Sequence, residues 1–122
     1  MVLFFKNKLS WDSGRQNSGY LKFKIIESSF FKFDMYLLKF PEGSFISEHT
    51  DPAINGYRHY RCNIILKKSK FGGEFLSEHS IINWTRLKFF RPDISKHSVT
   101  KVVGGSRIVL SIGSLLKNKH LK

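Results

Sequence analysis

Residues 96–113 read KHSVTKVVGGSRIVLSIG, two apolar-rich segments separated by Gly104-Gly105. In the first segment apolar and polar residues alternate, as they do in a half-buried β-strand. The second segment is largely apolar, and adjacent glycines favour a turn between strands. The pattern therefore predicts that residues 96–103 and 106–113 form a final β-hairpin.

The rest of the chain repeats this pattern of short strands and turn signals, which is typical of all-β sandwiches and barrels. From residue 31 onward we expect eight strands, at residues 31–40, 44–48, 57–67, 74–76, 80–84, 86–90, 96–103 and 106–113. Eight antiparallel strands in two sheets make a jelly roll, the double-stranded β-helix. The predicted fold class is therefore all-β, a double-stranded β-helix (jelly roll) with little added helix.

The length of 122 residues suits a single domain, expected over residues 1–122. We place the double-stranded β-helix core at residues 31–113 and a basic tail at residues 115–122, with a further strand at 20–27. Cys62 is the one cysteine, which fits a reducing compartment. No apolar run approaches the roughly 20 residues that span a bilayer. We therefore expect a soluble, cytoplasmic protein without a membrane partner.

The net charge is +12, from 21 Lys and Arg against 9 Asp and Glu. Such a surface attracts polyanions, so a nucleic-acid partner is one interpretation. The alternative is that a chain rich in Lys, Phe, Asn and Ile reflects AT-rich coding sequence. Charge alone leaves both interpretations open.

Three potential metal ligands occur as His-x-Asp followed later by a second histidine: His49, Asp51 and His97. Two imidazoles and one carboxylate on one face of a metal, with open positions opposite, suit non-haem Fe(II) that activates oxygen. On a strand, side chains two residues apart point to the same face, so His49 and Asp51 can reach one ion. Each residue alone is weak evidence, and the joint pattern favours a metal site.

Arg107 follows His97 by ten residues and lies in the apolar run Ile108-Val109-Leu110. An arginine in such a strand needs an anionic partner, and its planar guanidinium matches a carboxylate. That partner is either a carboxylate of the protein, such as Glu74, or a co-substrate. We favour the co-substrate.

The segment YRHYRCN, residues 57–63, is a second dense group of polar side chains. His59, Arg61 and Asn63 share one strand face with Tyr57. If this face lines the barrel, Arg61 and Asn63 lie near the metal and contribute to cofactor binding. The alternative is an exposed polar strand end.

The order of these motifs resembles that of the Fe(II)/2-oxoglutarate-dependent dioxygenases, in particular the small prolyl-hydroxylase-like branch. Gly72-Gly73-Glu74 is similar to the Gly-Gly-Glu of that branch, and the resemblance covers roughly residues 31–113. It implies that His49, Asp51 and His97 hold Fe(II) and that Arg107 binds the far carboxylate of 2-oxoglutarate. Val109 stands where some relatives have a serine, so only the arginine of their Arg-x-Ser pair is carried over.

The resemblance implies an oxygenase that uses molecular oxygen and 2-oxoglutarate, releases succinate and carbon dioxide, and hydroxylates a substrate. The sequence leaves little chain for a substrate-binding lid, so we expect a macromolecular substrate, either protein or nucleic acid. Two alternatives stay open: a non-catalytic basic β-module that binds nucleic acid, and a cupin-like metalloprotein with another reaction.

Overall fold

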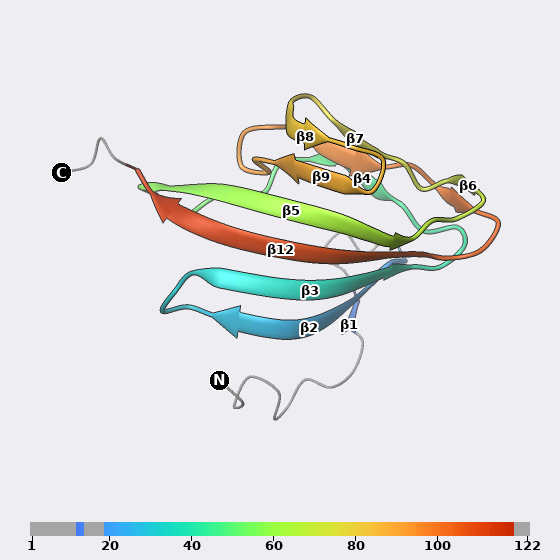
Figure 1. The fold of residues 1–122 in the computed structure, drawn as a ribbon, viewed down its shortest axis with the longest axis horizontal. Coiled ribbons are helices and arrows are strands. Elements are labelled where there is room, and N and C mark those ends of the chain that lie inside the picture. Colours follow the sequence, from blue (N-terminus) through green and yellow to red (C-terminus); the bar gives the residue numbers. More distant parts are fainter. Residues whose placement is uncertain (1–11, 14–18, 119–122) are drawn as a thin grey trace.

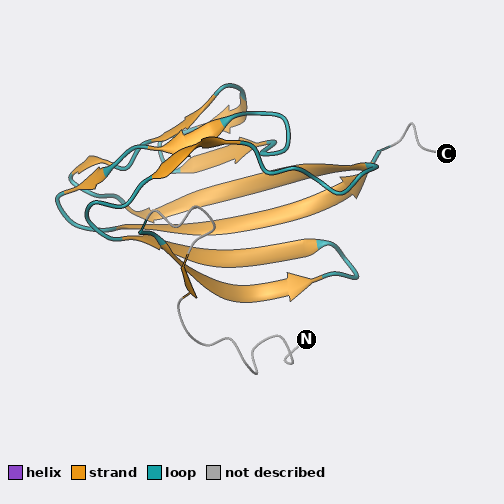
Figure 2. Cartoon of the chain, turned by 180° about the vertical axis from the view of Figure 1, so that it is seen from behind, coloured by secondary structure: helices purple, strands orange, loops and turns teal. Residues whose placement is uncertain are grey.

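The computed structural model describes residues 12–13 and 19–118, and these residues form strands and loops without a helix (Figures 1 and 2). None of the described residues therefore belongs to a helix that could cross a membrane. The strands are β1 (Asp12–Ser13), β2 (Leu21–Ser28), β3 (Phe33–Phe40), β4 (Ile46–His49), β5 (Tyr57–Lys67), β6 (Phe71–Gly72), β7 (Phe75–Ser77), β8 (Ser80–Asn83), β9 (Leu87–Phe90), β10 (His97–Val99), β11 (Val102–Val103) and β12 (Arg107–Lys117).

The strands divide between one large curved sheet and a layer of short strands (Figure 1). The large sheet has the order β1-β2-β3-β12-β5-β9-β8, and the short strands form the sheets β4-β10-β7 and β11-β6. All the neighbouring strands are antiparallel. This all-β, two-layer arrangement confirms the predicted jelly roll.

Strand β12 lies at the centre of the large sheet, between β3 and β5. Its residues alternate between buried and half-buried from Arg107 to Gly113, which is the two-residue period of a strand with one face turned inward. The register places Ser111 opposite Tyr36 on β3 and Asn63 on β5. The inward face of β12 therefore carries polar side chains among apolar ones.

The hydrophobic core joins the two layers. Phe40, Ile65 and Val109 come from the large sheet, and Val99 and Val102 come from the short strands. Tyr20, just before β2, stacks on Phe40 with ring centroids 5.2 Å apart and belongs to the same cluster. The large sheet thus begins ahead of residue 31, with β1 and β2.

The predicted final hairpin is wrong. Residues 96–103 form two strands, β10 and β11, and neither pairs with β12: β10 pairs with β4 and β7, and β11 pairs with β6. Gly104 and Gly105 have φ angles of 77° and 101°, which only glycine adopts readily. These glycines carry the chain from the short-strand layer into the large sheet instead of closing a hairpin.

The ends of the chain differ from expectation in part. The polar, turn-rich residues 10–19 favour a loop ahead of the expected strand at 20–27, but Asp12–Ser13 form β1, and residues 10–11 and 14–18 lie outside the described residues. Of the expected basic tail, residues 115–117 complete β12, and residues 119–122 are outside the description.

Candidate metal centre

The two histidines of the motif meet because their strands are neighbours in register. On β4 and β10, His49 and His97 are direct cross-strand partners. Their ring centroids lie 4.4 Å apart. Residues 48 positions apart in sequence thus present their imidazoles side by side.

Asp51 lies two residues beyond the end of β4, where its backbone N–H donates to the carbonyl of Pro92 at 2.7 Å. Its Oδ1 is 3.3 Å from His49 Nε2 and its Oδ2 is 3.4 Å from His97 Nε2. The potential ligand atoms of the three residues lie within 4.8 Å of one another. This spacing allows one ion to contact all three side chains.

The far nitrogen of each imidazole is engaged by the backbone. His49 Nδ1 lies 2.7 Å from the carbonyl oxygen of Ser47, and His97 Nδ1 lies 2.9 Å from that of Ser95. A carbonyl oxygen can only accept a hydrogen bond, so each Nδ1 carries a hydrogen and Nε2 is the nitrogen that faces Asp51. In the tautomer that leaves both Nε2 atoms without a hydrogen, two lone pairs and a carboxylate face one another, and a cation between the three groups would attract all of them. The donor set therefore fits a divalent metal.

Aromatic side chains fix the orientation of His97. Its ring lies 5.0 Å from that of Phe90 and 6.1 Å from that of Phe75, and the residue is 7% exposed. His49 and Asp51 are half-buried. His97 is therefore the most enclosed of the three potential ligands, and all three line one cavity.

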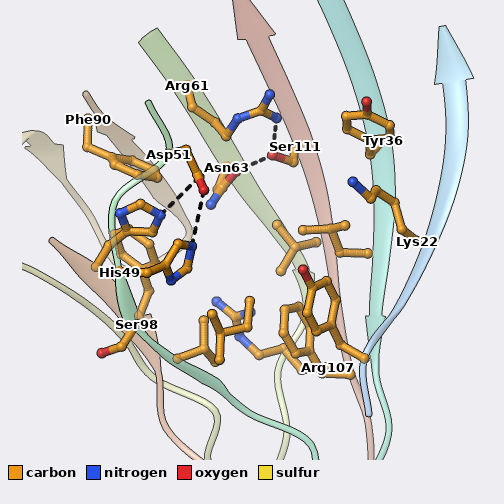
Figure 3. A pocket seen from close by; sticks show the side chains of 18 of the residues that line it. Lys22, Tyr36, His49, Asp51, Arg61, Asn63, Phe90, Ser98, Arg107 and Ser111 are labelled. Atoms are coloured by element: carbon orange, nitrogen blue, oxygen red, sulfur yellow. Dashed lines mark hydrogen bonds and ion pairs between the residues drawn. The ribbon is translucent and has the colours of Figure 1, made fainter. Parts of the chain in front are cut away.

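That cavity has a volume of about 270 Å³ and extends from the His49-Asp51-His97 cluster to the large sheet (Figure 3). Its lining includes Arg107, Arg61 and Asn63, the other residues singled out in the sequence. All six candidate site residues thus face one cavity.

Arg107 is the most deeply buried cation of this cavity, with 3% of its surface exposed. Its guanidinium carbon lies 5.0 Å from the centroid of the Phe40 ring. Burial lowers the pKa of Arg107 to about 10, so the group stays charged at neutral pH. Among residues 19–118 no carboxylate pairs with it, and the alternative of an ion pair with Glu74 is not found. A buried, charged guanidinium without a protein carboxylate is suited to an anionic ligand.

Arg61 lines this cavity, and its guanidinium also has partners within the protein. Its guanidinium donates at 2.7 Å to Asp34 Oδ1 and at 2.7 Å to Ser111 Oγ. The Ser111 hydroxyl in turn donates to Asn63 Oδ1 at 2.6 Å. Arg61 is therefore neutralised within the protein, whereas the amide nitrogen of Asn63 remains as a donor for a ligand.

The lining residues that the sequence analysis missed include Asp34 and Tyr36 on β3 and Lys22 on β2. Lys22 Nζ lies 4.4 Å from the centroid of the Tyr36 ring. Burial, followed by the charges of Asp34 and Glu27, raises the pKa of Tyr36 to about 12, so its hydroxyl stays protonated. The available signal was the alternation of residues 34, 36, 38 and 40, which all line the cavity.

Gly113 provides the space for the Arg61 guanidinium. A Cβ at this position would lie 2.5 Å from Arg61 Cζ and 3.0 Å from Asp34 Oδ1. We expect Gly113→Ala to break the Arg61–Asp34 pair and lower the free energy of unfolding by about 1–3 kcal/mol. Urea denaturation measures this, with Ser114→Ala on the same strand as the control. Equal effects of the two substitutions would contradict the steric argument.

Asp93 stabilises the turn whose Pro92 carbonyl holds Asp51. It accepts hydrogen bonds from the Arg91 guanidinium at 2.6 and 3.2 Å and from the His59 backbone N–H at 3.3 Å. Burial alone would raise the pKa of Asp93, but these hydrogen bonds outweigh it, so the pKa is lowered below 3.8. The folded state thus prefers the charged carboxylate.

This gives a pH-dependent prediction for Asp93→Asn. Folding lowers the pKa of Asp93 below its ordinary value of 3.8. The stabilisation that the charged carboxylate provides is therefore complete above pH 3.8 and is lost as the pH falls through the pKa of the folded state. We expect the substitution to cost about 1–3 kcal/mol at pH 7 and progressively less in acid. Urea denaturation between pH 7 and pH 3 tests this, with Glu42→Gln, at an exposed carboxylate, as the control. A cost independent of pH would contradict it.

Comparison with known proteins gives similarity only at the level of structure. No family model matches the chain, and no curated protein matches it in sequence. A prolyl-4-hydroxylase from Pseudomonas putida has a TM-score of 0.66 at 15% identity, covering 89% of this chain and 78% of its own. KdgF from Halomonas sp. has a TM-score of 0.61 at 13% identity, covering 98% of this chain and 96% of its own. A predicted oxalate decarboxylase from Thermotoga maritima has a TM-score of 0.59 at 19% identity, covering 80% of this chain and 81% of its own.

The chain has a cupin-type jelly-roll fold. This fold is common to the prolyl hydroxylase and to proteins whose names indicate other activities. The jelly roll and the convergence of the three potential ligands are therefore shown, and a specific reaction has to be argued from the cavity.

Proposed function

We propose that this protein is an Fe(II)- and 2-oxoglutarate-dependent oxygenase that hydroxylates a macromolecular substrate. The observation that carries the proposal is Arg107, a buried cation with no carboxylate partner among the described residues, in the same cavity as His49, Asp51 and His97. A metal site alone would fit many cupin-type proteins. A metal site with a buried guanidinium in the same cavity fits a metal-bound dicarboxylate.

His49, Asp51 and His97 would hold the iron through two nitrogens and one carboxylate oxygen. Three ligands from one side leave positions for the co-substrate and for oxygen. Bound Fe(II) supplies the oxidation, in which oxygen and 2-oxoglutarate become succinate, carbon dioxide and one hydroxyl group on the substrate. The protein contributes the placement of these groups.

Arg107 would bind the far carboxylate of 2-oxoglutarate through two parallel N–H···O bonds. The Phe40 ring packs against the guanidinium, and the apolar Val109 and Leu38 line the same cavity, so Arg107 is largely removed from water. In such a setting a charge-assisted hydrogen bond is stronger than in water. The amide nitrogen of Asn63 is a further donor toward the co-substrate.

The macromolecular substrate is inferred from the shape of the cavity entrance. Lys22, Tyr36 and His59 line the cavity and are only half-buried, and Pro52 beside them is exposed. No helix or long insertion of the described residues covers this region. A large molecule could therefore present one group to the metal without entering the protein.

The test has two stages. Anaerobic addition of Fe(II) and 2-oxoglutarate should produce a visible metal-to-ligand absorption band. Admission of oxygen should then release succinate, more of it with a peptide or nucleic-acid pool that contains the substrate. If metal binds but neither the absorption band nor succinate appears, the protein is a cupin-like metalloprotein that catalyses another reaction. If no metal binds, the result supports the alternative of a non-catalytic basic module that binds nucleic acid.

A further inference from the structure

Arg107 also lines a second cavity, which opens at the end of the molecule formed by β6 and the loops around it. This cavity has a volume of about 380 Å³ and shares Arg107 and Phe75 with the metal cavity. Most of its remaining lining comes from the segment between β5 and β7, residues 68–74, and from Thr85 and Lys88. It is thus a separate concave site on the surface.

The charge of this second cavity is strongly positive. Its lining holds four cations, Lys68, Lys70, Lys88 and Arg107, against one carboxylate, Glu74. None of the four cations forms an ion pair with a carboxylate of residues 19–118. Uncompensated charges of one sign in a concave site raise the local concentration of the opposite ion.

Lys88 shows how closely these charges interact. It is half-buried on β9, and its ammonium donates to Asn83 Oδ1 at 2.7 Å, a neutral acceptor. Burial and then the charges of Arg107 and Lys68 lower the pKa of Lys88, while Glu74 acts in the opposite direction. A multiply charged anion placed among these groups would offset both the cost of burying the Lys88 charge and the repulsion between the cations.

We propose that the second cavity binds a phosphate group. The ammonium groups of Lys68, Lys70 and Lys88 suit an anion with several oxygens and more than one negative charge, and the charge of Arg107 at the border of the two cavities adds to the positive field. The volume admits a phosphorylated small molecule or one phosphate with adjoining atoms of a nucleic-acid backbone. The proposal does not depend on the reaction at the metal, because its ligand is recognised by lysines outside the metal cavity.

Binding of inorganic pyrophosphate, measured by calorimetry at low ionic strength, tests the site. The variant is Lys68→Gln/Lys88→Gln, which removes both charges, keeps polar side chains and leaves Arg107 intact. The control is Lys96→Gln/Lys117→Gln, which removes the same net charge from exposed lysines elsewhere. We expect the pocket variant to bind pyrophosphate about tenfold more weakly or worse, and the control to bind within about twofold of wild type.

A short single-stranded oligonucleotide, added as a competitor, distinguishes the two sources of phosphate. If the oligonucleotide displaces pyrophosphate from wild type and not from the pocket variant, the ligand is a nucleic-acid backbone. If pyrophosphate binds and the oligonucleotide does not displace it, the ligand is a phosphorylated small molecule. Both outcomes support the site. Equal weakening in the pocket variant and the control, or no pyrophosphate binding by wild type, would overturn the proposal. Circular dichroism of both variants verifies that they fold.

Discussion

Asp51→Ala should remove tight metal binding while leaving the protein folded. The carboxylate faces both histidine Nε2 atoms, so its loss takes away the one negative charge among the three ligands. Loss of a residue that only hydrogen-bonds to a metal ligand lowers metal affinity by about 10- to 100-fold. We therefore expect at least about a 100-fold loss for this ligand, measured with Co(II) as a spectroscopic substitute for Fe(II).

Glu48→Ala is the matched control for this experiment. Glu48 is an exposed carboxylate on β4, next to His49 but outside the ligand cluster. Its loss changes the net charge equally, so its metal affinity should stay within about threefold of wild type. Similar losses in the two variants would mean that general electrostatics, and not coordination, holds the ion.

Arg107→Met should abolish 2-oxoglutarate binding with little effect on the metal. The substitution approximately keeps the volume but removes the buried cation, so the far carboxylate loses its paired hydrogen bonds. Truncating one partner of a buried charged pair costs about 2–5 kcal/mol, equivalent to roughly 30- to 5000-fold in affinity. Calorimetric titration of 2-oxoglutarate into the Co(II)-loaded protein measures this loss.

The same variant also separates ligand binding from stability. Because Arg107 is 3% exposed and has no carboxylate partner among the described residues, an apolar replacement removes a buried charge. We expect the free energy of unfolding without ligand to be unchanged or higher. Arg107→Lys, which keeps the charge but not the bidentate geometry, should bind 2-oxoglutarate with intermediate affinity. Equal loss of metal and 2-oxoglutarate in Arg107→Met would contradict the assigned role.

The sequence predicted the fold class because alternation along strands and turn signals between them are short-range patterns. The strand expected at residues 57–67 matches β5, and the strand expected at 106–113 covers the first part of β12, which continues to Lys117. The spacing of His49 and Asp51 needs only a strand end to bring them together. The approach of His97 could be expected only from the resemblance to a known fold.

What the sequence did not predict depends on pairing between distant segments. The apparent hairpin at residues 96–113 failed because a glycine pair can connect two layers as readily as two neighbouring strands. The pairing of Arg61 with Asp34 was not predicted, because Asp34 lies on another strand and only the register of β3, β12 and β5 brings the two together. Tyr36 and Lys22 were missed for the same reason.

The sheet that contains both histidines is made of strands of only four, three and three residues, β4, β10 and β7. Such short ladders have few hydrogen bonds of their own and open easily. An ion held at the His49–His97 rung would act as a reversible cross-link between β4 and β10. Metal loading would then set the rigidity of one wall of the barrel.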